Sequence, residues 1–596
     1  MSIMQPIEAA ARIRRDRRLD LAVAIALAVI LTLGWAIHDW WQLSRMLLPD
    51  PDDVMRLAQV RDWLGGQGIN DWTQHRMAPP LGAPMHWSRV NDIGIAALIL
   101  AATPIVGRHG AELFAVLTYP ALLFAAALYL SARIARRLWG PSAGPVAIVL
   151  MALAYPGTTV FIPGRIDHHA LQVVLVQLFV LLQMRKPTWG NGMAAGAVTA
   201  VSLVVGLETA LQIAVLIGAM ALAWIVFGVR ERARLGGFAV GLGATTLAFL
   251  IFLRPDFWSP NYCDAFTPAS STGTLIGAAA LGALALATPR LTNWRWRAGS
   301  GLALGALTVV ATVIAFPACV NGPYGVMDPF LRANFLPFID EANGLFRQIE
   351  VTRILAIGGL MTVGAMAAIW MLYRAPRQWG VTLPVAAVVL VSAGLMLFQV
   401  RSAYIGAPLA APILAGVVLA ARRRTRWQTP AVIAAWLACA GMSYSELPRR
   451  IVHVAAPSSS AASADALPTT RVKCSAGDSW AQVDRYPAGV IMAGTSVAAY
   501  VIGDTRHSTV GAGYHRSNQG NMAMYRFFLS PPNQSIAIAR AWKVNYVLWC
   551  PNDFDELHVG RAYPDSLAAA LRANRPPDWL VPVPLRDTPM RFYRVR

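Results

Sequence analysis

Charged side chains are scarce in this sequence: Asp, Glu, Lys and Arg make up only 14% of its 596 residues. In soluble proteins they make up about a quarter. Hydrophobic residues reach 56%, and the mean hydropathy is +0.47. Such a composition excludes a disordered chain and a string of ordinary soluble domains. It predicts a mainly α-helical protein that crosses a membrane several times.

Cysteine is also rare, and the five cysteines form no CxxC pair of the kind that binds zinc. Cys439 falls in an apolar segment, where a small core residue is expected. The other four fall in two predicted outside loops, as Cys263 and Cys319, and in the tail, as Cys474 and Cys550. Two disulfides in an oxidising compartment and four free thiols both fit this distribution.

Thirteen segments are apolar and long enough to cross a bilayer, which takes about 20 residues per helix. The stretch 93–107 is also apolar but shorter, and we expect it to be re-entrant or interfacial. The thirteen segments are centred on 21–38, 111–132, 143–160, 168–184, 191–207, 209–228, 236–253, 272–288, 299–317, 354–373, 380–399, 403–421 and 429–446.

Basic residues concentrate on one side of this layout. The segments on that side hold 22 Lys and Arg but 4 Asp and Glu, whereas the opposite loop 39–92 holds 5 and 7. Because Lys and Arg accumulate in cytoplasmic loops, the N-terminus should be cytoplasmic and the tail outside. The net charge of +20 then reflects membrane anchoring, and we expect no nucleic-acid partner.

The layout predicts two domains, a membrane domain at 1–447 and a soluble periplasmic domain at 448–596. A Ser/Ala/Pro-rich stretch at 456–468 is typical of a linker. The outside loops of the membrane domain are expected at 39–110, 161–168, 254–271 and 318–353.

Alternating patterns in the tail predict a small α/β domain. Strand-like runs occur at 488–492, 544–549 and 590–595, and helical runs at 534–542 and 564–573.

Acidic side chains cluster directly after the first span, in the run DPDDVMR. Asp50, Asp52 and Asp53 lie within four positions, and such close carboxylates repel one another. A divalent cation would relieve the repulsion, and so would Arg56 or Arg61. A solvated helix N-terminus, whose dipole stabilises acids, is the alternative.

A second polar cluster, GRIDHH, falls in the short loop between the third and fourth spans. Asp167 and His169 have a spacing that can place a carboxylate and an imidazole around one metal ion. His168 is a further candidate ligand. Hydrogen-bonded structural histidines are the alternative.

The outside loop 318–353 is long for a connector, which indicates a substrate-binding role. Arg401 stands at the outer end of a span, where a guanidinium suits the phosphate of a lipid head group. It would alternatively be a snorkelling anchor. The pattern alone does not choose among the acids of the loop, which are Asp328, Asp340, Glu341 and Glu350.

Together these motifs resemble the GT-C membrane glycosyltransferases, and most of all the catalytic subunit of oligosaccharyltransferase. The matching stretches are DPDDVMR from Asp50, GRIDHHALQ from Gly164, VRSAYIGAPL from Val400 and FIDEANG from Phe338. Thirteen spans followed by an outside C-terminal domain are also the architecture of that family.

The resemblance implies a metal site. Asp50 would be a metal ligand and the catalytic carboxylate of the first loop, with Asp52 as the alternative. Asp167 and His169 would be further ligands, and His168 a possible third from the same motif. The metal would be a divalent ion, Mg²⁺ or Mn²⁺.

The resemblance also implies how the donor is held. Arg401 would bind the phosphate or diphosphate of a polyprenyl-linked sugar. Glu341, or Glu350 in its place, would complete the site from the loop before the tenth span. A carboxylate, Asp50 or Asp52, would take the proton of the acceptor hydroxyl.

The function implied is transfer of a sugar or oligosaccharide to a glycan, lipid or protein acceptor at the outer face of the bacterial cytoplasmic membrane. The Trp-Trp-Asp motif that reads the acceptor in that family is absent from 490–520, which puts transfer to asparagine in doubt. A polar run in that region would bind phosphate or glycan, or form a solvated loop: Thr505, Arg506, His507, Tyr514, His515 and Arg516.

A transporter or flippase of lipid-linked glycans is the alternative function. Such a protein would place charged residues near the middle of its spans. Glu208 is the main candidate for a residue of that kind, because the other ionisable residues gather at the outer rim.

Overall fold

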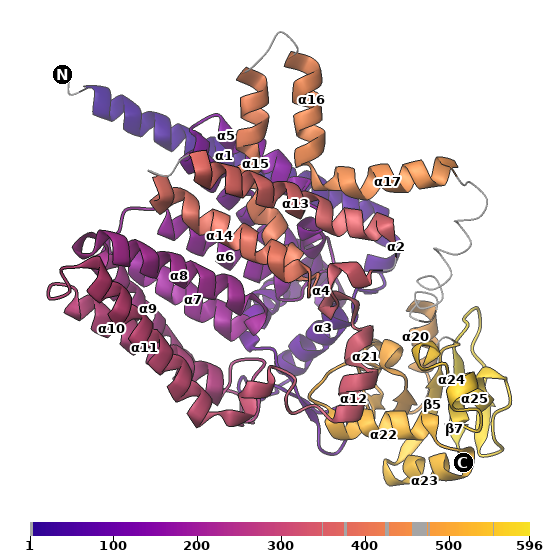
Figure 1. Cartoon of the computed structure of the whole chain (residues 1–596). Helices are drawn as coiled ribbons and strands as arrows, with labels where there is room; N and C mark the ends of the chain where they lie inside the picture. Colours follow the sequence, from indigo (N-terminus) through magenta and orange to yellow (C-terminus); the bar gives the residue numbers. More distant parts are fainter. Residues whose placement is uncertain are drawn as a thin grey trace.

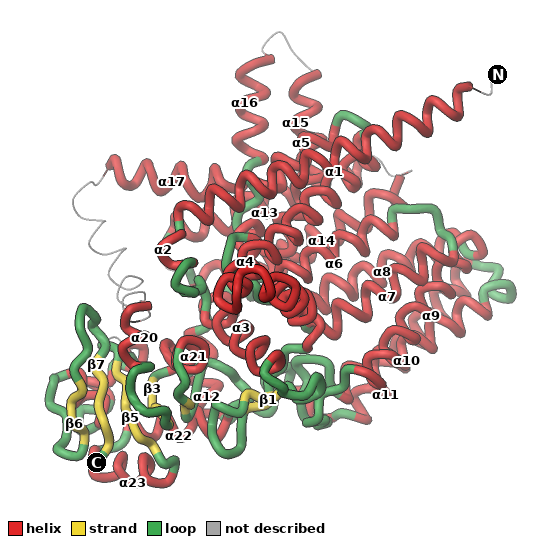
Figure 2. Tube along the Cα trace, turned by 180° about the vertical axis from the view of Figure 1, so that it is seen from behind, coloured by secondary structure: helices red, strands yellow, loops and turns green. Residues whose placement is uncertain are grey.

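Helices make up most of the computed structural model, with a small sheet near the C-terminus (Figure 1; Figure 2). The predicted linker at 456–468 lies outside the described residues. These residues are 4–348, 350–374, 378–423, 428–455, 474, 477–551 and 553–596.

The apolar helices correspond one for one to the thirteen predicted segments, which confirms a mainly α, polytopic membrane protein. Among the described residues, nine helices are long and apolar enough to span a membrane: α1 (Met4–His38), α4 (Arg89–Trp139), α8 (Ala210–Phe227), α9 (Val229–Phe252), α10 (Pro268–Ala287), α11 (Trp294–Ala315), α13 (Val351–Arg374), α14 (Trp379–Met396) and α15 (Ser402–Arg423). Four shorter apolar helices complete the set: α5 (Ala143–Ala152), α6 (His169–Gln183), α7 (Trp189–Val205) and α16 (Gln428–Cys439).

Two of the predicted segments are broken rather than continuous. Helix α5 ends at Ala152 and a 3₁₀ turn follows at Gly157–Phe161, because Pro156 disfavours a helical conformation at the residue before it. Helix α16 ends at Cys439, and α17 (Gly441–Ala455) then leaves in another direction (Figure 1). The segment predicted at 429–446 therefore comprises one helix and the start of a second, rather than one continuous helix. A Cβ at Gly441 would lie 2.6 Å from the backbone of Tyr155.

The stretch 93–107 is helical and ends at a kink that separates it from the rest of α4, and its re-entrant or interfacial placement stays a prediction. The helix is interrupted at Gly107, whose φ of 71° is strained for residues with a Cβ. It then continues as the predicted span 111–132.

Helix α15 lies at the centre of the bundle: 83% of its apolar window is buried, against 0% for α11. Helices α7 and α9 approach each other closely through glycines. A Cβ at Gly196 would lie 2.2 Å from the carbonyl oxygen of Phe238, and one at Gly241 would lie 2.1 Å from that of Met193. Small residues permit such contacts between membrane helices.

The C-terminal region forms a five-stranded sheet in the order β4-β3-β5-β7-β6. Strand β3 is parallel to β4 and β5, and β7 is antiparallel to β5 and β6. The predicted strands correspond to β3, β5 and β7, and the predicted helices to α23 and α25. The strands are β3 (Val490–Ala493), β4 (Ser508–Thr509), β5 (Val544–Trp549), β6 (Leu580–Val583) and β7 (Arg591–Val595), with helices α20 (Gly477–Val483), α21 (Thr495–Asp504), α22 (Asn518–Leu529), α23 (Pro532–Ala541), α24 (Val559–Ala562) and α25 (Leu567–Arg572).

The loop between α1 and α4 joins this sheet to the apolar helices. The backbone N–H of Ala78 donates to the carbonyl of Thr509, and the N–H of Thr509 donates to that of Arg76, each at 2.8 Å. Helix α3 packs against α21, where Nη1 of Arg61 donates to the carbonyl of Gly503 at 2.7 Å. The short elements of the loops are α2 (Trp40–Leu43), α3 (Pro51–Leu64), β1 (Thr73–Gln74), β2 (Ala83–Pro84) and α12 (Pro329–Asn334).

Both cysteine pairs form disulfides, Cys263 with Cys319 and Cys474 with Cys550. The first joins the loop after α9 to the loop after α11. The second ties the start of the C-terminal region to the end of β5. Cys439 is free and buried, as expected.

The contact between α3 and α21 should be sensitive to one added methyl group. A Cβ at Gly503 would lie 2.0 Å from Cγ1 of Val54, so Gly503→Ala should destabilise the protein by about 1–3 kcal/mol through overpacking. Thermal unfolding of the purified protein in detergent would measure the loss. Gly560→Ala is the control, because no heavy atom lies within 4 Å of its added Cβ. Equal stability of the two variants would contradict the packing described.

Candidate functional site

A cavity of about 580 Å³ is lined by loops between the apolar helices, by the ends of these helices and by the C-terminal region. Five residues predicted for the site line it: Asp50, Asp52, His169, Glu341 and Arg401. They come from four separate stretches of the sequence. A concave site with a few converging polar groups is the usual form of a ligand-binding site.

Asp50 caps the N-terminus of α3. Its Oδ1 accepts a hydrogen bond of 3.0 Å from the backbone N–H of Asp52, so the helix N-terminus stabilises this acid. Pro51 occupies the first helical position, where its missing N–H costs nothing. Oδ2 of Asp50 lies 2.7 Å from Nη1 of Arg165, a residue of the second motif.

The arginines of the first loop pair with other acids. Arg56 forms ion pairs with Asp92 at 3.1 Å and Asp167 at 3.2 Å, and Arg61 forms one with Glu112 at 2.7 Å. The expectation that these arginines relieve the repulsion among the first-loop acids is wrong, because α3 directs their side chains toward α4 and the second motif.

Asp53 joins the two motifs. Its Oδ1 accepts hydrogen bonds of 2.8 Å from the backbone N–H groups of both Ile166 and Asp167. Its Oδ2 lies 3.3 Å from Nε of Arg165. Burial raises the pKa of Asp53 to about 7, although Arg165 opposes the rise. Asp53 therefore holds the second motif against α3 rather than facing the cavity.

Asp167 and His168 lie behind the cavity wall, and each is 3% exposed. Oδ1 of Asp167 lies 2.6 Å from Nδ1 of His168 and accepts from Nη2 of Arg56 at 3.2 Å. Its Oδ2 has no hydrogen-bond partner in the described part of the chain and lies 3.5 Å from Nε2 of His169. Buried polar atoms normally have a hydrogen-bond partner or another ligand, and a cation would provide one for this oxygen.

The acid of this pair stays ionised. Burial raises the pKa of Asp167, but His168 and His169 beside it outweigh burial and hold the pKa well below its usual value. Burial lowers the pKa of His168, but Asp167 and Glu208 outweigh it and raise the pKa to about 10.

Asp167, His168 and His169 each offer a ligand atom, and these atoms lie within 4.8 Å of one another. Carboxylate oxygen and imidazole nitrogen suit several divalent metals. His168 is already engaged, with Nδ1 at Asp167 and Nε2 3.3 Å from Oε1 of Glu208. The better placed ligand atoms are therefore Oδ2 of Asp167 and Nε2 of His169.

Asp52 lines the same wall among other acids. Burial raises the pKa of Asp52 well above its usual value, and the neighbouring carboxylates of Asp50, Asp167 and Glu341 raise it further. Like charges held this close are relieved by a proton or by a cation. The charge of this wall therefore fits a divalent metal.

Arg401 precedes α15 and lines the cavity. Its backbone N–H donates to the carbonyl of Glu341 at 3.2 Å, and its Nε donates to Oε1 of Gln399 at 3.2 Å. Burial lowers the pKa of Arg401, but Tyr324, Glu208 and Glu341 outweigh it and raise the pKa. The cavity thus contains a permanent cation beside its acids.

Sequence motifs did not find every residue of this site. Glu208, singled out only as a transporter candidate, lines the cavity beside His169. Trp87 lies 4.4 Å from the Arg56 guanidinium, and no motif signal marked it. Glu350, the alternative to Glu341, is exposed at the start of α13.

The polar run predicted in the tail divides between two places. Tyr514 and His515 line the cavity. Arg506 instead pairs with Asp484 at 3.3 Å on the surface, and His507 is fully buried against backbone groups. Only the end of the run therefore lines this cavity.

No protein-family model and no curated protein matches the sequence. Solved structures do match: the archaeal oligosaccharyltransferase AglB from Archaeoglobus fulgidus, in complex with an inhibitory peptide and a dolichol-phosphate, aligns with a TM-score of 0.58 and 16% identity. The alignment covers 89% of this chain and 69% of AglB. The protein has the fold of AglB.

Two further AglB structures show the same fold. The form tethered to an acceptor peptide with the NVT sequon gives a TM-score of 0.61 at 16% identity, covering 89% of this chain and 69% of AglB. The complex with Zn and sulfate gives 0.58 at 14% identity, covering 88% and 67%. The motifs of the loops had predicted a fold of this kind.

The wall of acids and imidazoles should bind a divalent cation. We expect Asp167→Asn and His169→Gln each to weaken Mn²⁺ binding at least about tenfold, because each removes a ligand atom. Isothermal titration of metal-free protein in detergent would measure the affinity. His75→Gln is the control, since that imidazole is 61% exposed and does not line the cavity. Unchanged affinity in both site variants would place the metal elsewhere.

Proposed function

We propose that the protein is a membrane glycosyltransferase. It moves a sugar or oligosaccharide from a polyprenyl-phosphate or polyprenyl-diphosphate donor to an acceptor at the outer face of the bacterial cytoplasmic membrane. The observation that carries this proposal is that Asp50, Asp52, His169, Glu341 and Arg401 line one cavity in a chain with the AglB fold.

The donor phosphate belongs beside Arg401. A guanidinium can donate to two phosphate oxygens at once, and Arg401 stands where the apolar helix α15 begins, so a lipid chain can lie along the helices while its head enters the cavity. AglB has been solved with dolichol-phosphate, which supports a polyprenyl donor. As the glycosidic bond breaks, Arg401 stabilises the charge that grows on the departing phosphate.

The acid wall would hold a divalent metal, Mg²⁺ or Mn²⁺. Its ligands would be Asp167, His169 and a first-loop acid, Asp50 or Asp52, with Glu341 from the opposite loop. The unpartnered Oδ2 of Asp167 supports this assignment, and AglB has been solved with Zn and sulfate. When bound, such an ion neutralises negative charge on the leaving phosphate.

The C-terminal domain supplies the acceptor side. Residues after the parallel strands β3 and β5 line the cavity, among them Thr495, Ser496 and Asp553, and ligands of parallel sheets bind at this end of the strands. The acceptor would be a glycan, a lipid or a protein. The NVT peptide tethered to AglB does not define the acceptor of this protein, because the Trp-Trp-Asp motif is absent from 490–520.

The topology proposed has a cytoplasmic N-terminus and a periplasmic domain at 448–596, after the membrane domain at 1–447. The disulfides Cys263–Cys319 and Cys474–Cys550 support it, because both lie in parts assigned to the outside and disulfides persist in oxidising compartments.

Transport of lipid-linked glycans receives less support. A transporter would place ionisable residues near the middle of its helices. Glu208, which the sequence marked for that role, lines the cavity with His169 and Arg401, and its Oε2 accepts from Gln172 at 2.8 Å. Its position fits a part in the acid wall.

Transfer should require the acids of both motifs. We expect Asp50→Ala and Asp167→Ala to abolish sugar transfer from a lipid-linked donor, with expression intact, because each removes charge from the reacting centre. Chromatography of the products from purified protein would measure transfer. Asp39→Ala is the control, as that acid is 44% exposed and pairs only locally with His38. Full activity in either site variant would refute its assignment.

Loss of the cavity guanidinium should slow transfer. Arg401→Gln should lower kcat by about 10²–10³, the effect of removing one donor to a developing negative charge. Initial rates with a polyprenyl-phosphate sugar would show this. Arg347→Gln, an exposed arginine of the neighbouring loop, should leave the rate unchanged. Equal rates for the two variants would mean that Arg401 does not contact the leaving group.

A further inference from the structure

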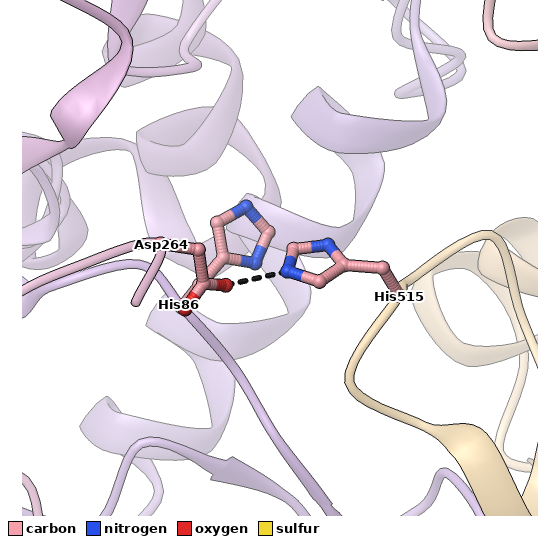
Figure 3. Close-up of side chains that lie close together, drawn as sticks. All are labelled: His86, Asp264 and His515. Atoms are coloured by element: carbon pink, nitrogen blue, oxygen red, sulfur yellow. Dashed lines mark hydrogen bonds and ion pairs between the residues drawn. The ribbon is translucent and has the colours of Figure 1, made fainter. Parts of the chain in front are cut away.

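A second cluster of titratable side chains lines the same cavity. His86 comes from the first loop, Asp264 from the loop between α9 and α10, and His515 from the loop between β4 and α22 (Figure 3). Nε2 of His515 lies 2.5 Å from Oδ2 of Asp264. The rings of His86 and His515 have centroids 4.9 Å apart.

Asp264 is held rigidly. Nε of Arg516 donates to its Oδ2 at 2.9 Å and Nη2 donates to its Oδ1 at 2.6 Å, while Nη1 of Arg516 donates to the carbonyl of Met85 at 3.2 Å. Burial raises the pKa of Asp264, but His515 and Arg516 outweigh burial and hold the pKa well below its usual value. Asp264 is therefore an oriented, ionised carboxylate.

The same three side chains could in principle take a metal ion, but the surroundings oppose this. Arg516 occupies both oxygens of Asp264 and already balances its charge. A divalent ion here would meet the guanidinium at close range, and like charges in a buried site repel strongly. The geometry fits proton transfer better than metal binding.

His515 has the arrangement of a general base. With Nε2–H donated to Asp264, the proton-free nitrogen of the ring is Nδ1, which makes no hydrogen bond to the described residues. Figure 3 shows this nitrogen turned away from Asp264, and the residue lines the cavity. A base whose second nitrogen is oriented by a carboxylate is the constellation of many hydrolases and transferases.

His515 also stands close to the place assigned to the donor phosphate. The ring of Tyr324 meets that of His515 edge-on with centroids 5.2 Å apart, and Tyr324 is also a neighbour of Arg401. One tyrosine thus separates the imidazole from the guanidinium.

The first-loop acids are less suited to accept a proton. Asp50 is paired with Arg165 at 2.7 Å. Asp52 lies among other carboxylates, where a bound cation would occupy its oxygens. A metal ligand is a weak base, because its lone pairs are already shared.

We infer that His515, oriented by Asp264, is the general base that activates a hydroxyl-bearing acceptor. The acceptor oxygen attacks the anomeric carbon and forms the new C–O bond, while its proton passes to Nδ1 of His515. The bond between the anomeric carbon and the phosphate oxygen breaks, and its electron pair leaves with the phosphate. Asp264 stabilises the imidazolium of His515 until His515 releases the proton to solvent. This inference rests on the proposed function.

Hydrolysis tests the inference without knowledge of the natural acceptor, since water is the simplest hydroxyl acceptor. The full chain in lipid nanodiscs is given undecaprenyl-phosphate-linked glucose, galactose, mannose or arabinose, and release of free sugar is measured. We expect His515→Gln to lower kcat about 100-fold or more with little change in the KM for the donor. We expect His515→Gly to regain rate when imidazole is added.

The control is His75→Gln, which should match the wild type. A merely structural role for His515 would raise KM or unfold the protein, and added imidazole would not restore it. If His515→Gln keeps most of the wild-type kcat, His515 is not the base, while the proposed function stands. If the wild type releases no sugar from any of the donors, the protein does not use these polyprenyl-phosphate sugars, and this inference fails together with that part of the proposed function.

Discussion

The buried carboxylate of Asp53 is the contact on which the rest of the site depends. It accepts hydrogen bonds from the backbone N–H groups of Ile166 and Asp167, and so fixes the second motif against the first turn of α3. A buried charge is tolerated only when it is satisfied, so the two motifs cannot slide past each other without large cost. Asp50 and Asp167 thereby keep a fixed relation across more than a hundred residues of sequence.

Around this contact the cavity separates two chemistries. One wall consists of acids that repel one another, and Oδ2 of Asp167, which accepts no hydrogen bond from the described residues, would favour a bound cation. The other wall, with His515 and Asp264, belongs partly to the C-terminal domain and pairs its carboxylate with Arg516. Arg401 lies between the two.

Much of the fold could be predicted because hydropathy is a local property. Each apolar segment gave a helix, and the strands β3, β5 and β7 were found from their patterns. The predictions that failed concern the places where a helix ends and one very short strand. Pro156 interrupts the predicted segment 143–160, because a proline disfavours the helical conformation at the residue before it. Between α16 and α17, the backbone of Tyr155 passes so close to Gly441 that a Cβ there would lie 2.6 Å from it. Strand β4, with two residues, is too short for any pattern.

The sequence by itself determined the spans and the motifs that carry Asp50, Asp167, His169 and Arg401, because composition and short spacings are written along the chain. Only the tertiary structure decided which charges meet. Arg56 pairs with Asp92 and Asp167 rather than with its neighbours, and Asp264 meets His515 from the other domain. Ion pairs form between groups that packing brings within a few ångströms, and separation along the chain says nothing about that distance.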